Sequence, residues 1–254
     1  MAGKTKPSPL AAFEANMADA HQLVRIAACL TNQRTQRMRA EPRERIGAAL
    51  GVGKRQRDQL DWLINEDVWL IFRPGSGVQR HDFVDHRPLL RQALVAACAA
   101  TETYIADKVM ERVGPLLYDG TATPRLRKLT LDLDSWMEID QRYLSKKRWG
   151  LRTLVVEPYV RENASTAPNK VGEMLSLIGV DKPFKQLDRQ RKVKGRETEV
   201  LLDRITERRN HIAHTGDRQG RGRAQLSIDE VNTDLAALES VVAAIEELVK
   251  PSDS

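Results

Sequence analysis

The feature that most constrains the fold is an alanine-rich apolar run over residues 89–105, LLRQALVAACAATETYI. Arg87 and Pro88 stand directly before this run, and proline fits the first turn of a helix without losing a needed hydrogen-bond donor. The next helix-breaking pair is Gly114 and Pro115. We therefore expect a long core helix that opens at Pro88 and closes at Gly114-Pro115.

The composition agrees with a helical protein. Of the 254 residues, 41% are apolar, which is enough for a hydrophobic core, and only 5% are aromatic. Abundant Ala, Leu, Glu and Arg, with no Gly-rich phosphate loop, favour helix over sheet. No apolar run approaches the roughly 18 residues that a membrane span needs, and residues 1–10 lack the apolar core of a signal peptide. We expect an all-α, cytoplasmic protein without a membrane segment.

Other segments have weaker signals. Apolar residues at helical spacing predict a first helix over 10–30, and residues 226–249 are expected to form the last long helix. Residues 68–72 are the best strand candidate, which could pair with 78–84 as a hairpin. The segment 46–65 is predicted to form a helix, a glycine turn and an amphipathic helix. Helix-turn-helix DNA-binding proteins have this arrangement, but so do many helical proteins that never bind DNA.

A second informative stretch is ERRNHIAHTG, residues 207–216. It ends an amphipathic helix, for which Gly216 is the expected stop signal. Arg209 is permanently cationic and can fork onto two phosphate oxygens, and His214 can transfer a proton near neutral pH. Asn210 and His214 should share a face opposite the apolar stripe, with Arg209 on its flank. The alternative is structural: Arg209 caps the helix C-terminus and His214 is an ordinary helix-end histidine.

The positive charge is concentrated around this stretch. Residues 185–223 hold twelve Lys or Arg against six Asp or Glu, a net +6 that equals the charge of the whole chain. Such a field would attract a polyanion, although basic runs are often only solvated faces. The candidate contacts to such a polyanion are Arg208, Lys192, Lys194, Arg221 and Arg223. We call them the candidate RNA contacts, because the family resemblance described below implies RNA.

Three aromatic residues, Trp136, Tyr143 and Trp149, are interleaved with the basic run 146–148. They could stack on unpaired bases, but aromatic residues are more often core anchors, and we expect the core role here. Cys29 and Cys98 each lie in an alanine-rich run and are expected to be small buried hydrophobes. No metal-binding spacing of Cys or His occurs, so we expect no catalytic metal and no cofactor.

The pattern Arg-Asn-X-X-X-His at the end of a helix, in a largely helical chain, resembles the HEPN superfamily and is most similar to its RiboL-PSP-type group. The Glu102-X-Tyr104 pair inside the long apolar run and the last long helix add to the resemblance. It implies an antiparallel helical bundle with a small, partly irregular insert after the first helix. We expect a single domain over 1–254, with 31–87 as an unplaced insert and 88–250 as the best-matched core.

The resemblance also implies a function. HEPN ribonucleases cleave RNA without metal, through attack by the ribose 2′-hydroxyl that leaves a 2′,3′-cyclic phosphate, and they are homodimers with a shared site. Arg209, Asn210 and His214 would carry this chemistry here, in a toxin or antiphage defence effector with an antitoxin or defence-system partner. Glu102 is expected to be structural. Two alternatives remain: a non-catalytic HEPN scaffold that binds RNA, a nucleotide or a partner protein, and a DNA-binding regulator built on 46–65.

Overall fold

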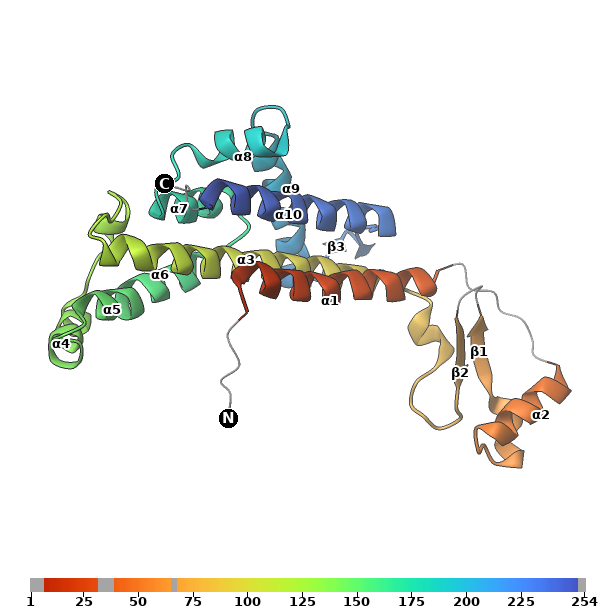
Figure 1. Cartoon of the computed structure of the whole chain (residues 1–254). Helices are drawn as coiled ribbons and strands as arrows, with labels where there is room; N and C mark the ends of the chain where they lie inside the picture. The colour runs from red at the N-terminus through yellow and green to blue at the C-terminus, as the bar shows by residue number, and fades with distance from the viewer. Residues whose placement is uncertain (1–6, 32–38, 65–67, 251–254) are drawn as a thin grey trace.

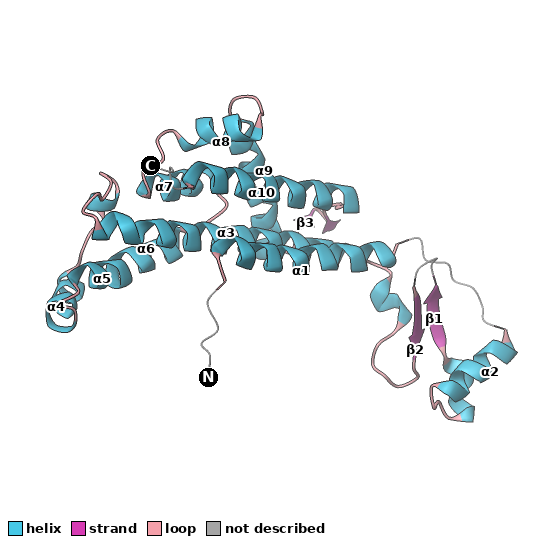
Figure 2. Ribbon diagram, viewed as in Figure 1, coloured by secondary structure: helices cyan, strands magenta, loops and turns pink. Residues whose placement is uncertain are grey.

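The protein is described by a computed structural model that covers residues 7–31, 39–64 and 68–250. Three long helices run side by side in it, namely α1 (Pro9–Cys29), α3 (Arg87–Tyr118) and α10 (Ile228–Val249). The chain direction in Figure 1 shows that α1 is antiparallel to both α3 and α10. Figure 2 shows how little strand the chain contains beside these helices. The expected all-α, HEPN-like helical fold is confirmed, as are the first and last helices.

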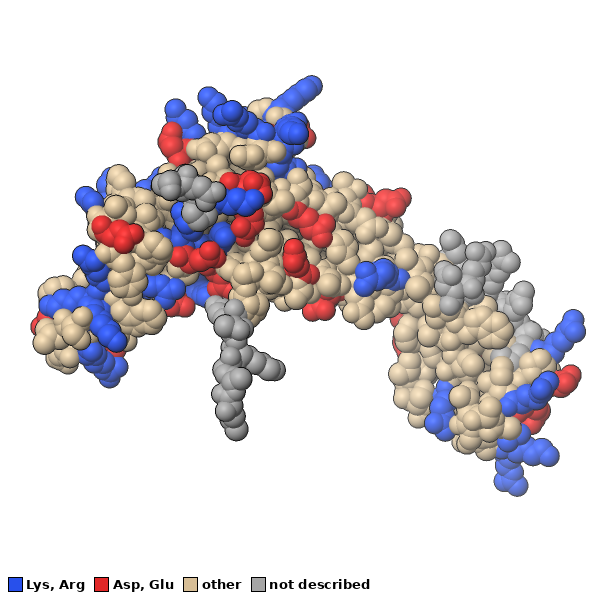
Figure 3. Space-filling view, viewed as in Figure 1, with Lys and Arg blue, Asp and Glu red and all other residues tan. Residues whose placement is uncertain are grey.

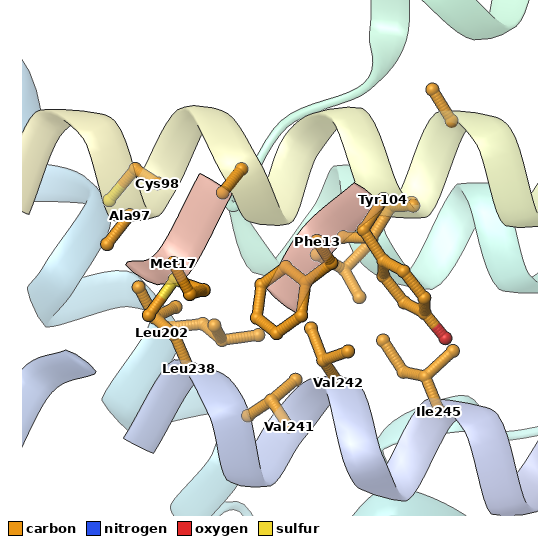
Figure 4. Packing of buried hydrophobic residues seen from close by; sticks show 14 of the residues in the cluster. Phe13, Met17, Ala97, Cys98, Tyr104, Leu202, Leu238, Val241, Val242 and Ile245 are labelled. Atoms are coloured by element: carbon orange, nitrogen blue, oxygen red, sulfur yellow. The ribbon is translucent and has the colours of Figure 1, made fainter. Parts of the chain in front are cut away.

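The core lies between these helices and α9 (Glu197–Thr215). Phe13 of α1 and Tyr104 of α3 meet there with ring centres 5.6 Å apart, next to Val242 of α10 (Figure 4). Leu202 of α9 belongs to the same cluster and lies beside Met17. Cys98 is fully buried in the same cluster, and burial raises the pKa of its thiol to about 12. The thiol therefore behaves as a small apolar group, as expected.

The expected end of the long helix at Gly114-Pro115 is wrong. Helix α3 continues to Tyr118 with Pro115 inside it. A proline inside a helix removes one backbone hydrogen bond and crowds the carbonyl four residues earlier. The following residues, Leu116 and Leu117, pack against the core and offset this cost. Tertiary packing therefore stabilises one more turn than the local signal allows.

Shorter helices cover the C-terminal half of α3. The chain is not helical around Gly120 and Pro124, which separate α3 from these helices, as expected. A helical stretch over 147–163 contains a π-helical turn at its centre, η4. The elements in chain order are η3 (Leu126–Lys128), α4 (Leu133–Arg142), α5 (Lys147–Leu151), η4 (Arg152–Val156), α6 (Glu157–Asn163), α7 (Pro168–Leu177) and α8 (Pro183–Arg191).

The expected core role of the aromatic residues in this region is wrong for both tryptophans. Trp136 is 46% exposed and Trp149 is 45% exposed, while Tyr143 is half-buried. Gly150 explains the difference, because a Cβ atom there would lie only 3.1 Å from Ile139 and Tyr143. Helices α4 and α5 approach so closely at this glycine that Ile139 and Tyr143 fill the contact, which leaves the two larger rings outside.

The segment before α3 contains α2 (Ala40–Ala49), η1 (Lys54–Gln59), β1 (Asp61–Ile64), β2 (Trp69–Phe72) and η2 (Arg80–Phe83). Figure 1 places α2 and the two strands beyond the ends of α1 and α3, apart from the bundle. The expected strand at 68–72 is confirmed. The division of the chain into one domain with an insert at 31–87 stays a prediction.

Two expectations for this segment are wrong. Strand β2 pairs antiparallel with β1, in the register Asp61↔Phe72, and not with 78–84. Residues 80–83 instead form a 3₁₀ turn, in which the Asp82 carboxylate accepts a hydrogen bond from the Gln79 backbone N–H at 2.8 Å. The amphipathic helix expected within 46–65 is a 3₁₀ turn followed by β1, because a short apolar run can satisfy either a helix or a strand. The second helix of a DNA-reading motif is therefore missing from the described part of this segment.

No helix among the described residues is both long enough and apolar enough to cross a membrane.

Candidate functional site at the end of helix α9

Helix α9 carries the Arg-Asn-X-X-X-His pattern in its last two turns. Its apolar stripe, which includes Leu202 and Ile205, is buried against the bundle. Gly216 ends the helix in the left-handed conformation, with φ of 61°. The Gly216 N–H donates to the Ile212 carbonyl at 3.1 Å, and the Asp217 N–H donates to the His211 carbonyl at 3.1 Å. The expected stop signal is therefore confirmed.

The start of α9 is held by a side chain from the preceding helix. Asp188 of α8 accepts hydrogen bonds from the backbone N–H groups of Arg196 at 2.7 Å and Thr198 at 3.0 Å. First-turn N–H groups have no partner inside a helix, so this carboxylate caps α9. Burial by itself would raise the pKa of Asp188, but hydrogen bonds from Thr198 and Arg196 outweigh it and hold the pKa below its usual value.

Arg209 is turned toward α3. Its Nη2 donates to Glu102 Oε1, and its Nη1 donates to Asn210 Oδ1 at 3.0 Å. The Arg209 and Glu102 side chains are each only 23% exposed, and Glu102 Oε1 also accepts from the Thr166 backbone N–H at 3.3 Å. Arg209 is thus fixed in one orientation by an acid 107 positions away in the sequence. Glu102 therefore orients a candidate site residue, a role that the Glu-X-Tyr pair in the long helix does not reveal.

His214 has a different environment. It is exposed in the last turn of α9, while Asn210, one turn earlier, is half-buried. Among the described residues, no hydrogen bond or ion pair connects His214 with Arg209 or Asn210. The structure therefore brings Arg209, Asn210 and Glu102 together, and it leaves the His214 imidazole facing solvent.

A buried cluster of charges lies next to the motif. Asp217 is 3% exposed, and its Oδ2 accepts from Arg91 Nε and from Arg208 Nη2, each at 2.9 Å. The same two arginines donate to the backbone carbonyls of Ala224 and Gln225, each at 2.8 Å. These contacts tie the segment after α9, which contains the short strands β3 (Arg218–Gln219) and β4 (Gly222–Arg223), to α3 and to α9 itself. We call Arg91, Arg208 and Asp217 the Asp217 cluster.

Each charge in the Asp217 cluster has a structural use. Arg208 is one of the candidate RNA contacts, and here its side chain is half-buried and its Nη2 donates to both Asp217 and Gln225. Its role in RNA binding stays a prediction.

The other four candidate RNA contacts separate into two pairs. Lys192 and Lys194 precede α9, whereas Arg221 and Arg223 follow it, and all four are exposed. None of them makes an ion pair within the described residues. Because α9 has 19 residues, roughly 28 Å of helix separates the pairs. Figure 3 shows the basic side chains that gather around α8 and the start of α9.

No group of three or more His, Cys, Asp or Glu side chains that could hold a metal ion occurs in the part of the chain that the structure describes.

The helical bundle, with an arginine, an asparagine and a histidine in the closing turns of α9, defines a HEPN-type domain. The family profile RiboL-PSP-HEPN matches residues 75–251, which is more than half of the chain, and the protein belongs to this family. The matched range extends from just before α3 to the end of α10 and spans residues 207–216. No curated protein and no solved structure matches the chain. HEPN domains are often ribonucleases, so membership in the family indicates an RNA-related function.

Proposed function

We propose that the protein is a metal-independent endoribonuclease that cleaves single-stranded RNA, with Arg209, Asn210 and His214 in its active site. The observation that carries this proposal is the fixed Arg209 guanidinium, held by Glu102 and Asn210 next to the solvent-facing turn that presents His214. A pre-oriented cation and an accessible imidazole are two of the groups that the cleavage of a phosphodiester requires from a protein.

The attacking group in this reaction belongs to the RNA. The ribose 2′-hydroxyl attacks the adjacent phosphorus, the bond to the 5′-oxygen breaks, and the products are a 2′,3′-cyclic phosphate and a 5′-hydroxyl. Arg209 stabilises the negative charge on the phosphoryl oxygens, since contacts to Glu102 and Asn210 use only part of its five N–H donors. His214 transfers a proton to or from the reacting oxygens. Asn210 orients Arg209 and is a further donor for phosphate.

The complete site requires two protomers. Cleavage needs both a base and an acid, and the motif supplies one histidine per chain. An exposed His214 at the end of a helix is accessible to the same surface of a second copy, so a two-fold dimer would present two histidines and two arginines to one phosphodiester. By analogy with HEPN ribonucleases, we place this enzyme in the cytoplasm as a toxin or antiphage effector that an antitoxin or other defence-system partner controls.

The decisive measurement is cleavage of single-stranded RNA in EDTA. We expect His214→Ala and Arg209→Ala each to lower the cleavage rate by about 10²- to 10⁴-fold, the usual loss when a positioned acid-base or charge-stabilising group is removed. His211→Ala is the matched control, because His211 is also exposed in the last turns of α9. A His214→Ala variant that keeps the wild-type rate would contradict the proposal, as would activity that vanishes in EDTA and returns with added metal.

One observation favours a second candidate, a non-catalytic HEPN scaffold that binds RNA, a nucleotide or a partner protein. The Arg209–Glu102 ion pair joins α9 to α3 inside one protomer, which is a structural use of the arginine. In that case the wild type would not cleave RNA, and Arg209→Ala would only destabilise the fold, by about 1 kcal/mol for a partly exposed ion pair. Cleavage of RNA by the wild type separates the two candidates, and chemical unfolding of Arg209→Ala measures how much the ion pair stabilises the fold.

A further inference from the structure

The end of the molecule formed by α4 and α5 has an unusual surface. Trp136 of α4 and Trp149 of α5 are nearly half exposed, although tryptophan is the side chain with the most apolar area to bury. Leu144, in the connection between the two helices, is 67% exposed. This surface lies at the C-terminal end of α3, whereas Glu102 and the motif lie near the middle of that helix (Figure 1).

The exposed rings are associated with basic side chains. Lys147 Nζ lies 5.5 Å from the centre of the Trp136 ring, and the Arg152 guanidinium lies 5.4 Å from the centre of the Trp149 ring. A cation over a ring face is attracted to the π system, so each contact holds a positive charge next to an exposed aromatic surface. Figure 3 shows Lys and Arg side chains gathered over the α4–α5 end.

An open pocket of about 700 Å³ lies in this surface, lined by Tyr118 and residues 144–149. Its charged lining residues are Lys146, Lys147 and Arg148, and no acid is among them. Lys147 pairs with Asp140 at 2.7 Å outside the pocket, and Arg148 Nη1 donates to the Tyr118 carbonyl. The pocket is therefore apolar and aromatic with a purely positive set of charges.

We propose that this surface, formed by Trp136, Trp149 and the basic run 146–148, binds single-stranded RNA. Unpaired bases would stack on the two indole rings, and the basic side chains would contact the phosphates between them. Basic grooves with exposed aromatic rings bind single strands in this way, because every base has a π face and every linkage a negative charge. Duplex RNA has its bases stacked inside the helix and cannot use the rings. Lys146 and Arg148, which have no acidic partner among the described residues, favour a polyanion over an apolar protein partner.

The test uses the full-length protein and a single-stranded RNA of about 12 nucleotides, a typical site size. Its 2′-hydroxyls are methylated, so 2′-hydroxyl attack is impossible and binding is measured apart from the cleavage proposed above. We expect Trp136→Ala and Trp149→Ala each to weaken the affinity, measured by fluorescence anisotropy, by about fivefold or more. The matched control is Trp69→Ala, since Trp69 of β2 is 62% exposed and lies outside this surface.

Tryptophan fluorescence gives a second readout, which does not depend on whether the fold tolerates alanine at positions 136 and 149. A base stacked on an indole quenches its emission, so the RNA should quench the wild type and Trp69→Phe. The double variant Trp136→Phe/Trp149→Phe should bind but show little quenching, because phenylalanine still stacks. Weaker binding by Trp136→Ala and Trp149→Ala, with Trp69→Ala unchanged, would uphold the surface even if the protein proves not to cleave RNA.

Three results would overturn the proposal. The first is unchanged affinity in the two alanine variants, and the second is equal competition by duplex RNA. The third is a loss of self-association or of a protein complex in Trp136→Ala/Trp149→Ala while the affinity for RNA stays intact, which would make this surface a protein interface.

Discussion

The end of α9 and the α4–α5 surface both present basic side chains to solvent, but the two regions hold them differently. At the end of α9, ion pairs within the protein hold the charged side chains in place. Glu102 fixes Arg209, and the Asp217 cluster fixes the segment that follows the helix. At the α4–α5 surface, Lys147 has only an exposed partner, and the rings of Trp136 and Trp149 lie open. Charge stabilisation at a phosphorus atom requires a cation that is fixed in place, as Arg209 is, whereas stacking on a flexible strand tolerates movement.

The largest effect on this comparison is expected when the buried ion pairs of the Asp217 cluster are removed. Asp217→Ala should lower the free energy of unfolding by about 3–5 kcal/mol, because it leaves Arg91 and Arg208 without their buried counter-ion. Urea unfolding measures the change. Asp203→Ala, which removes an exposed acid of α9 with no ion pair in the described structure, should change the free energy by less than about 0.5 kcal/mol. Equal changes in the free energy of unfolding in the two variants would contradict the conclusion that the Asp217 cluster stabilises the end of α9.

The start of α9 should show a smaller effect that depends on pH. Asp188→Ala should cost about 1.5–3 kcal/mol near pH 7, as expected when hydrogen bonds to a carboxylate are removed. Because the folded-state pKa of Asp188 lies below its usual value, the contribution is complete above the unfolded pKa of about 3.9 and disappears as the pH falls through the folded-state pKa. Urea unfolding from pH 7 to pH 3 measures the difference from wild type. A difference that grows toward low pH would contradict the cap.

The exposed cations at the two ends of α9 allow a test of which end of the helix contacts RNA. If RNA approaches the motif, neutralising Arg221 and Arg223 to Gln should lower the slope of log affinity against log salt by about 1.4, or about 0.7 for each phosphate that is no longer neutralised. Lys192→Gln/Lys194→Gln is the matched pair at the far end of the helix and should change the slope less. Affinity for methylated single-stranded RNA between low and moderate salt measures both. Identical slopes in the two double variants would mean that the RNA contacts both ends of α9 equally or neither.

The smallest effect is expected at the α4–α5 surface. Trp136→Ala and Trp149→Ala should each change the free energy of unfolding by no more than about 1 kcal/mol, or a few degrees in melting temperature, since both rings are nearly half exposed. Thermal unfolding by circular dichroism measures this. A loss as large as that of Asp217→Ala would mean that the rings are core residues after all.

The sequence is most informative where structure is local. The long helices and the stop at Gly216 follow from periodicity and backbone preference, and both are predictable. The contact between Arg209 and Glu102 is not, because it joins residues 107 positions apart and no local pattern encodes it. Asp217 looks like one acid among many in a basic window and is in fact its most buried charge.

The tryptophans and the insert depart from expectation for other physical reasons. Whether Trp136 and Trp149 are buried depends on how closely α4 and α5 approach at Gly150, which is a tertiary distance. In the insert, residues 61–64 are a short apolar run that periodicity alone cannot assign to helix or strand. Only the pairing with 69–72 decides the outcome.

Helix α3 has a consequence for substrate length. Glu102, which orients Arg209, and Tyr118, which lines the α4–α5 pocket, lie on this one uninterrupted helix, sixteen residues or roughly 24 Å apart along its axis. Because a helix has a fixed rise per residue, α3 holds the two proposed RNA contacts at a fixed distance from each other. An RNA of two or three nucleotides would reach only one of them, whereas a longer strand could occupy both, and cleavage would then occur at a set distance from the stacked bases.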